Sequence, residues 1–303
     1  MGCLSGLQRV QEMMENYKIF TDATADLTPE LMAGLPSVEI IPMQVAIGGK
    51  EYNYGSQEGI SAEEFYKIQR CGNFATTSQI NPTIFFQSFE PWLRQGTDIL
   101  YLCFSSGLSG TYQSASLAVQ ELQDEYPERK ILCIDTLCAA VGEGFLVREA
   151  AKMQSEGLSL EELAEWIELR KLRVCHWFTV DTFTHLKHGG RVSAAAATMG
   201  TALNIKPLLH VDENGKLQSV EKPRGRKKAI TAQLARMEQG WMPELGKSVL
   251  IGHADDLEAA IMLKGRVQEN FPDADIEIAY IGPVIGAHTG PGALALFYWG
   301  NNR

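Results

Sequence analysis

Twenty-five consecutive residues, from Ile278 to Asn302, contain no Asp, Glu, Lys or Arg and read IAYIGPVIGAHTGPGALALFYWGNN. Glycines and prolines interrupt this stretch too often for a membrane helix, which needs about 20 continuous apolar residues. We therefore expect His288 and Thr289 to lie on a tight turn flanked by buried strands. At a glycine-rich turn, backbone N–H groups can approach a ligand closely, and a histidine beside them can hold an anion or move a proton. A core turn whose histidine is simply hydrogen-bonded is the alternative.

Length and charge narrow the class of protein. With 303 residues the chain is long for one hydrophobic core, which favours two α/β domains. The formal net charge of −10 opposes binding to a phosphate backbone, so we expect no nucleic-acid partner. The one dense basic run, from Lys222 to Lys228, is typical of a solvated turn and helix start.

The cysteines and the N-terminus indicate the cellular setting. Six cysteines show neither a CxxC pair nor metal-ligand spacing, so we expect reduced core thiols and no metal site. The N-terminal residues lack the continuous apolar segment of a signal peptide, and no other segment could span a bilayer. The sequence therefore predicts a cytoplasmic protein without an integral membrane segment.

The first half of the chain alternates between strand and helix patterns. Strands are expected at residues 17–21, 38–47, 99–104 and 130–135, and helices from residue 28 onward and over residues 61–69, 81–94 and 139–154. Between the last two strands, SSGLSGTYQSASLAVQEL begins glycine-rich and turns helical. Such an order predicts a parallel sheet with right-handed crossovers.

The composition changes after a helix that Ser159 caps and that ends near Leu172. Beyond it we expect strands at residues 174–180, 205–211, 216–220, 248–252 and 275–281, and helices at residues 227–237 and 257–270. An Asn-Gly turn joins the second and third of these strands as a hairpin. We therefore expect an N-terminal extension at residues 1–16, an N-terminal parallel α/β domain at 17–170, and a C-terminal α+β domain at 171–303.

Three loops rich in hydroxyl groups stand out, at residues 75–79, 104–110 and 287–290. The first two adjoin the kind of sheet edge at which parallel α/β folds bind ligands. Ser105 and Ser106 leave a buried strand and enter a helix, so their hydroxyls and the N–H groups of the helix start could together hold an anion. Helix capping by Ser106 or Ser109 is the alternative.

Arg191 follows a double glycine in LKHGGRVS, an arrangement suited to bringing its guanidinium against a carboxylate or phosphate. A surface arginine at a helix end is the alternative. The sequence contains no Walker A, GxGxxG, GxSxG or HExxH motif, which leaves nucleotide hydrolysis and metalloprotease activity without support.

Six motifs in this chain resemble those of the DegV family, whose fatty-acid-binding members are the lipid-carrying subunits of bacterial fatty acid kinase. They are TDATADL at 21–27, TTSQINP at 76–82, SSGLSGTYQSA at 105–115, LKHGGRVS at 186–193, LNIKPLL at 203–209 and IGPVIGAHTGPGALALFY at 281–298. The resemblance covers essentially everything after the first sixteen residues. The chain departs from the family pattern at Ala23, Ala25 and Ala140, where hydroxyl residues are frequent.

The resemblance implies two α/β domains that hold one long-chain fatty acid in a tunnel between them. It implies that the carboxyl group lies at Thr77 or Ser78 and at Ser105 or Ser106, with Arg191, His288 and Thr289 near it. No cofactor is implied. The protein is then a bacterial carrier that presents the carboxyl group to a separate ATP-dependent fatty acid kinase and carries the acyl phosphate onward. That role leaves room for transient contact with a membrane.

Two other functions remain open at this stage. One is a serine acyl hydrolase with Ser106 as nucleophile and His288 as base, although the chain lacks a nucleophile elbow and an evident orienting carboxylate. The other is a regulatory module in which bound lipid sets the affinity for another protein.

Overall fold

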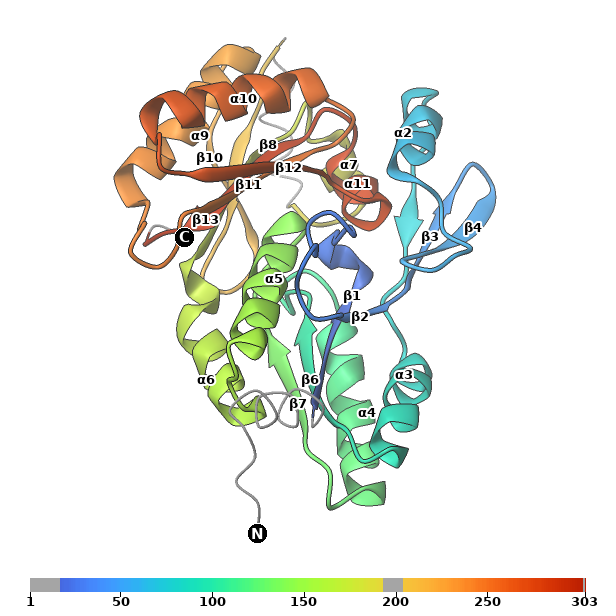
Figure 1. The fold of residues 1–303 in the computed structure, drawn as a ribbon. Coiled ribbons are helices and arrows are strands. Elements are labelled where there is room, and N and C mark those ends of the chain that lie inside the picture. Colours follow the sequence, from blue (N-terminus) through green and yellow to red (C-terminus); the bar gives the residue numbers. More distant parts are fainter. Residues whose placement is uncertain (1–16, 193–203, 302) are drawn as a thin grey trace.

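The computed structural model describes residues 17–192, 204–301 and 303. The expected N-terminal extension lies outside these residues, as do Ser193 and Leu203 at the ends of two of the motifs. Figure 1 shows two lobes, each built around its own sheet, with a smaller unit beside them. The expected α/β class with two domains is confirmed.

The N-terminal sheet has the strand order β2-β1-β6-β7, and all its pairings are parallel, as the sequence predicts. Asn81 caps its helix through Ile84 N–H, and Ser159 and Glu162 form a capping box. The strands are β1 (Tyr17–Asp22), β2 (Glu39–Ile41), β6 (Asp98–Cys103) and β7 (Ile131–Asp135). The helices are α3 (Pro82–Arg94), α4 (Thr111–Glu125), α5 (Val141–Ser155) and α6 (Leu160–Arg170), with the short 3-10 helices η1 (Ala23–Ala25) and η2 (Lys171–Arg173).

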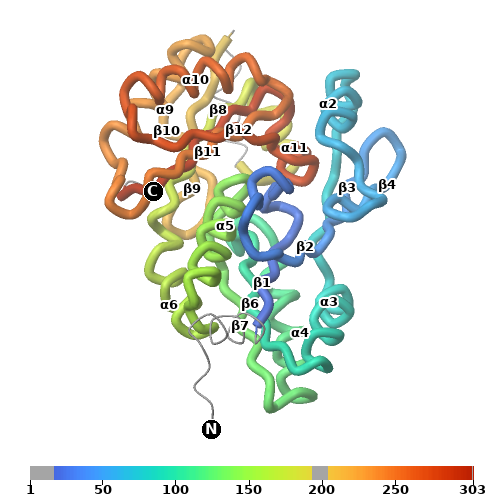
Figure 2. Tube along the Cα trace, viewed as in Figure 1, coloured from blue at the N-terminus to red at the C-terminus, as the bar shows by residue number. Residues whose placement is uncertain are grey.

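A small antiparallel sheet with the order β4-β3-β5 stands apart from the main N-terminal sheet. It consists of β3 (Met43–Ile47), β4 (Lys50–Tyr54) and β5 (Thr76–Thr77), and α2 (Ala62–Arg70) accompanies it. Figures 1 and 2 both show this unit alongside the C-terminal lobe. The Tyr66 hydroxyl donates to Ile281 O over 2.8 Å, and Gln69 Nε2 donates to Gly286 O over 3.1 Å. These bonds attach the unit to the C-terminal domain.

The C-terminal sheet is mixed and has the order β10-β9-β8-β13-β11-β12, in which β11 and β12 are parallel and the other pairs antiparallel. The strand β13, from the charge-free stretch, lies inside the sheet and is buried throughout. The strands are β8 (Val174–Thr179), β9 (Leu208–Val211), β10 (Leu217–Glu221), β11 (Ser248–His253), β12 (Asp275–Tyr280) and β13 (Leu294–Trp299). The helices are α7 (Thr184–His188), α9 (Arg226–Gly240), α10 (Leu257–Asn270) and α11 (Pro283–Thr289).

Three local predictions were wrong. The single strand expected over residues 38–47 is divided into β2 and β3, which belong to different sheets. The helix expected from Thr28 is a series of turns, because only Met32 N–H makes a bond four residues back and the next bonds span three residues. The tight turn expected at His288 is the helix α11, which Pro283 opens and Gly290, with φ of 73°, ends.

One hydrophobic core runs through both domains. It extends from β1 and β6 across α5 to Phe178, Phe297 and Trp299 in the C-terminal sheet. The first seven residues of α5, Val141–Val147, are all buried. The domains are therefore joined by shared packing as well as by the chain. No helix in the described part of the chain is both long and apolar enough to cross a membrane.

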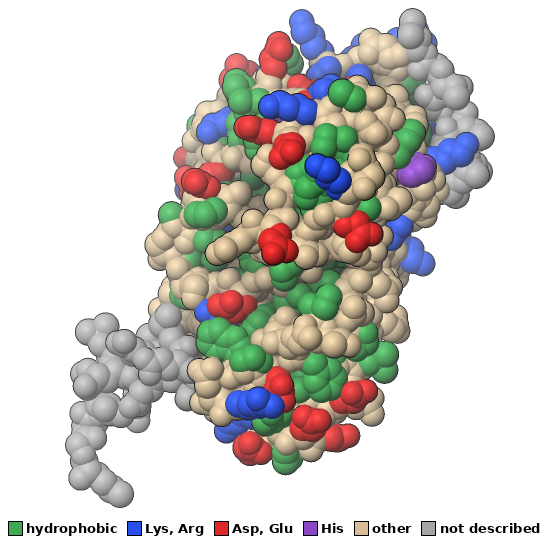
Figure 3. All heavy atoms as spheres, turned by 90° about the vertical axis from the view of Figure 1, so that its right-hand side faces the viewer, with side chains coloured by type: hydrophobic (Ala, Val, Ile, Leu, Met, Phe, Trp, Pro, Cys, Tyr) green, Lys and Arg blue, Asp and Glu red, His purple; other side chains and the backbone are tan. Residues whose placement is uncertain are grey.

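The face of the molecule turned to the viewer in Figure 3 carries interspersed acidic and basic side chains with apolar ones between them. Basic side chains do not gather into one patch among the described residues of this face. This distribution accords with the formal net charge of −10.

A buried acid pair joins the end of β1 to α5. The Thr24 hydroxyl oxygen lies 2.5 Å from Asp22 Oδ1 and 2.6 Å from Glu143 Oε2. Since Thr24 has one hydroxyl proton, one carboxyl group must supply the proton for the second bond. Asp22 also accepts from the Tyr101 hydroxyl and from Phe104 N–H, which favours its ionised form. Burial, and then the charge of Asp22, raise the pKa of Glu143 well above its usual range, so Glu143 holds the proton.

We expect Glu143→Gln to remove a pH-dependent loss of stability. The folded protein keeps the Glu143 proton, whereas the unfolded chain releases it above a pKa of about 4.3. The free energy of unfolding therefore falls with rising pH between the unfolded and folded pKa, by up to about 1.4 kcal/mol per pH unit from this group. Urea unfolding near pH 5, 6 and 7 should show the variant gaining stability relative to the parent as the pH rises. Glu156→Gln, at the exposed end of α5, should follow the parent. Parallel profiles for Glu143→Gln and the parent would mean that Glu143 is ionised in the fold.

Candidate functional site

A cavity of about 260 Å³ lies between the two domains. Its walls come from the loop after β6, the start of α5, β8, the β9–β10 hairpin, α11 and β13. Most of this wall is apolar, and it includes Phe104, Phe178, Val211, Leu217 and Phe297. The cavity is therefore suited to an apolar ligand.

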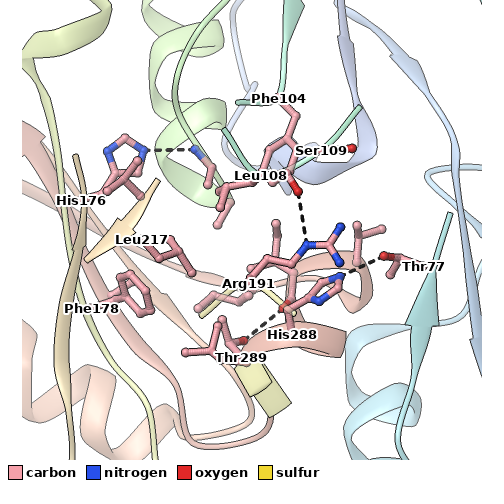
Figure 4. A pocket seen from close by; sticks show the side chains of 18 of the residues that line it. Thr77, Phe104, Leu108, Ser109, His176, Phe178, Arg191, Leu217, His288 and Thr289 are labelled. Atoms are coloured by element: carbon pink, nitrogen blue, oxygen red, sulfur yellow. Dashed lines mark hydrogen bonds between the residues drawn. The ribbon is translucent and has the colours of Figure 1, made fainter. Parts of the chain in front are cut away.

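Polar side chains gather on one side of the cavity (Figure 4). Thr77 comes from the small sheet, Ser109 from the loop before α4, Arg191 from the turn after α7, and His288 from α11. Gln79 and Thr289 line the cavity as well. Elements far apart in the sequence thus supply one polar end to an otherwise apolar space.

His288 and Thr77 form a hydrogen bond across the domains. His288 Nε2 lies 2.9 Å from the Thr77 hydroxyl oxygen, and His288 Nδ1 is buried without a partner among the described residues. A buried N–H without an acceptor costs more than a bare ring nitrogen, so the proton belongs on Nε2, which donates to Thr77. The hydroxyl proton of Thr77 is then available to an acceptor in the cavity.

The imidazole of His288 is neutral near pH 7. Burial is the largest cause, and the charges of Arg191 and His188 add to it, so that the pKa falls to about 4. Its Nδ1 packs so close to Gly189 that a Cβ there would lie 2.1 Å from it. The next residue, Gly190, has φ of 71°, which favours glycine. Gly189 therefore leaves room for the ring of His288, and Gly190 allows the chain to turn toward Arg191.

Arg191 stands at the rim of the cavity, partly in solvent. Its Nε donates to Leu108 O over 3.2 Å, and one terminal nitrogen donates to Gly189 O over 2.5 Å. The guanidinium thereby joins the loop after β6 to the turn after α7. It places a positive charge at the polar end of the cavity.

The structure brings together four of the seven residues that the sequence singles out: Thr77, Arg191, His288 and Thr289. The other three do not line the cavity. Ser105 is fully buried and donates to Gly215 O over 2.8 Å, in the turn of the β9–β10 hairpin. Ser106 and Ser78 are exposed.

The sequence motifs predict no ligand role for Ser109, Gln79 or His176. Ser109 is expected from the sequence only as a candidate helix cap. Its hydroxyl does accept from Thr111 N–H, but the residue also lines the cavity. His176 lines the apolar part, where its Nε2 accepts from Ala139 N–H, and burial lowers its pKa well below the usual range. It stands alone among mostly apolar residues of a buried strand, so no motif in the sequence marks it. No group of three or more His, Cys, Asp or Glu among the described residues is placed to hold a metal ion.

The chain is similar in sequence and in fold to known proteins. A family model described as "Uncharacterised protein, DegV family" matches residues 16–301. A DegV domain-containing protein of Clostridium perfringens is 40% identical over 290 residues, which cover 96% of this chain and 99% of the relative.

Two solved structures share the fold over nearly the whole chain. A DegV family protein from Thermus thermophilus, described by its fatty acid binding, has 32% identity and a TM-score of 0.82, and the match covers 94% of this chain and 100% of that one. DegV of Bacillus subtilis, described as a fatty acid binding protein, has 28% identity and a TM-score of 0.80, with coverage of 94% and 99%.

We expect His288 to titrate with a pKa of about 4 when its ring signals are followed by NMR. Arg191→Gln should raise this pKa by removing a nearby positive charge, yet leave it below 6.5, because burial is the largest cause of the shift. Lys187→Gln, a matched loss of charge at an exposed position on α7, should not change it. A parent protein whose His288 titrates near its ordinary value would show that burial does not disfavour the charged ring, which would contradict the proposed cause of the shift.

Proposed function

The chain belongs to the DegV family, and from this premise we propose that it binds one long-chain fatty acid in the cavity between its domains. Solved relatives with the same fold bind fatty acids, which supports the ligand class. We further propose that the protein, itself not an enzyme, presents the carboxyl group to a separate ATP-dependent kinase in the cytoplasm. The motif resemblance described above supports that second step.

The observation that carries the proposal is the division of the cavity into an apolar wall and one polar end. Burial of each acyl methylene contributes roughly 0.8 kcal/mol, so a long chain contributes on the order of 10 kcal/mol before the costs of ordering. A carboxylate taken into the same space without partners would be destabilised and would take up a proton. Its partners must therefore lie where the apolar wall ends.

Thr77 is the proposed central donor to the carboxylate. Neutral His288 donates to the Thr77 oxygen, and this leaves the threonine proton to be shared with the ligand. Ser109 is proposed as a further hydroxyl group near the carboxylate, and Arg191 as its countercharge. Thr289 lines the same end of the cavity, but its hydroxyl donates to Ile285 O over 3.2 Å. His288 then acts by orienting Thr77, and the positive charge comes from Arg191 alone.

Ser105 has a different proposed role. Its hydroxyl is committed to Gly215 O and also accepts from Gly107 N–H, so it holds the loop that carries Ser109 against the β9–β10 hairpin. Ser105 is therefore a positioning residue in this proposal. Ser78 and Ser106 serve as comparison positions, since both are exposed and outside the cavity wall.

The hydrolase alternative is not favoured by this geometry. It needs Ser106 within reach of His288, but Ser106 does not line the cavity that His288 lines. The His288 nitrogen that could accept a proton, Nδ1, packs against Gly189. Ser106 and His288 therefore do not lie together as a nucleophile and its base must.

We expect Thr77→Val to weaken fatty acid binding by about 1 to 3 kcal/mol, or roughly 5- to 150-fold, because a buried acceptor loses its donor. The neighbouring change Ser78→Ala should bind as the parent does. Affinity is measured with a fluorescent fatty acid, and native mass spectrometry of the parent should show one bound fatty acid per chain. Equal affinities for the two variants would place the carboxylate away from Thr77, and a parent that takes up no fatty acid would refute the proposed ligand.

We expect Arg191→Ala to reduce phosphorylation by a partner kinase more than it reduces fatty acid binding. An acyl phosphate carries more negative charge than a carboxylate, so a cation at the rim stabilises the product more than the substrate. Paired measurements of lipid affinity and kinase-dependent turnover on the folded variant test this, with Lys187→Ala as the control. Equal losses would make Arg191 an ordinary binding group, and ATP hydrolysis by the isolated chain would contradict the carrier role.

A further inference from the structure

A second pocket, of about 350 Å³, lies at the carboxyl end of β1. Its walls come from the residues around η1, from β2 and from the segment 54–61 that follows β4. None of its lining residues also lines the cavity between the domains. What this pocket binds is therefore a question separate from fatty acid binding.

Asp26 lines this pocket and carries an unpartnered carboxylate oxygen. Only 3% of the residue is exposed. Its carboxylate accepts a hydrogen bond from the backbone of Gly282, and Oδ1 lies 3.5 Å from the Tyr54 hydroxyl oxygen. The other oxygen, Oδ2, is buried and has no hydrogen-bond partner among the described residues. Leaving a buried carboxylate oxygen unpaired is costly, and native proteins seldom do so without a ligand or an ion.

Carboxyl groups gather around this oxygen. Asp22 also lines the pocket, and Glu143 is linked to Asp22 through the hydroxyl of Thr24. None of the ion pairs between described residues involves any of these three carboxyl groups. Burial, and to a lesser extent the charge of Asp22, raise the pKa of Asp26 well above its usual range. A group that brought both an N–H donor and a positive charge would pair the oxygen and offset the charge that Asp26 would carry beside Asp22.

We propose that this pocket binds a cationic nitrogen group, an ammonium or a guanidinium, that donates a hydrogen bond to Asp26 Oδ2. The side chains of Leu27, Ile40 and Ile60 line the same pocket and suit the aliphatic stem that carries such a group. The volume exceeds what one water molecule needs, and it admits a small organic cation or the end of an Arg or Lys side chain.

The test is a titration of the full chain, labelled with ¹³C at the aspartate carboxyl carbons. Methylguanidinium chloride and ethylammonium chloride are the probes, added in separate experiments near pH 7. The Asp26 signal should move saturably toward its ionised position, because a bound cation favours the carboxylate. Tetramethylammonium chloride is the matched control, since it carries the charge without an N–H donor. A signal that stays in place, or one that moves equally with tetramethylammonium, would overturn the proposal.

Two variants locate the binding. Asp26→Asn keeps an oxygen for the Gly282 contact, and asparagine tolerates the φ of 52° found at this position, so the variant should fold. It should weaken methylguanidinium binding about 10- to 100-fold, as expected for loss of a hydrogen bond to a charged group. Leu27→Phe fills the pocket from its apolar wall and leaves all the carboxyl groups in place, so the Asp26 signal should no longer respond. Binding as tight as that of the parent in either variant would place the cation elsewhere.

The source of the cation is settled by a third probe, the peptide acetyl-Gly-Arg-Gly-amide. If the peptide binds as methylguanidinium does, the pocket receives a basic side chain of a partner protein. If only the free cations bind, the ligand is a small amine or guanidine, and both outcomes support a cation pocket. Fatty acid uptake by Leu27→Phe, measured in parallel, should equal that of the parent, because Leu27 does not line the cavity between the domains, so failure of one proposal can be told from failure of the other.

Discussion

The functional site depends on how α11 is held, because a helix of seven residues cannot persist by itself. The hydroxyl of Tyr66 and the amide of Gln69 bond main-chain carbonyls at its start and middle, and Thr77 bonds His288 near its end. All three of these residues come from the unit around the small sheet, and Asp26 adds a contact to Gly282. The position of His288 thus depends on the other half of the chain as well as on the turn at Gly189. A folded C-terminal domain alone would lack these bonds from the small-sheet unit.

The sequence allowed the parallel sheet, the helix caps and the β9–β10 hairpin to be predicted, because each rests on a local pattern of apolar residues or cap and turn residues. It misassigned α11, since Pro283 opens this helix, and the glycines at 286 and 290 allow the close approach of Tyr66 and His185. The resemblance pointed to the polar end of the cavity but could not choose among serines in one loop. Ser105 and Ser109 are four residues apart, and only the fold shows that Ser105 points to Gly215 while Ser109 lines the cavity.

The formal net charge counts more ionised carboxylates than the folded protein carries. Glu143 is counted in the net charge of −10, yet its place beside Asp22 requires a proton in that pair. His288 is likewise uncharged, so the interior carries hydrogen-bonding groups with few free charges. The cation at the polar end of the cavity is Arg191, at its rim, where water can share the cost of keeping it charged.

Two hydrogen bonds join the loop after β6 to the C-terminal domain. Ser105 donates to Gly215 O, and Arg191 donates to Leu108 O. Both acceptors are main-chain carbonyls, one on each side of the boundary between the domains. A substitution at Leu108 that keeps the backbone path therefore leaves its bond to Arg191 intact, whereas a Cβ at Gly215 would lie 2.0 Å from Ser105 Oγ and disturb the other bond. Both bonds join the two domains beside the cavity, so any movement that separates the domains at this loop must break two side chain–main chain hydrogen bonds.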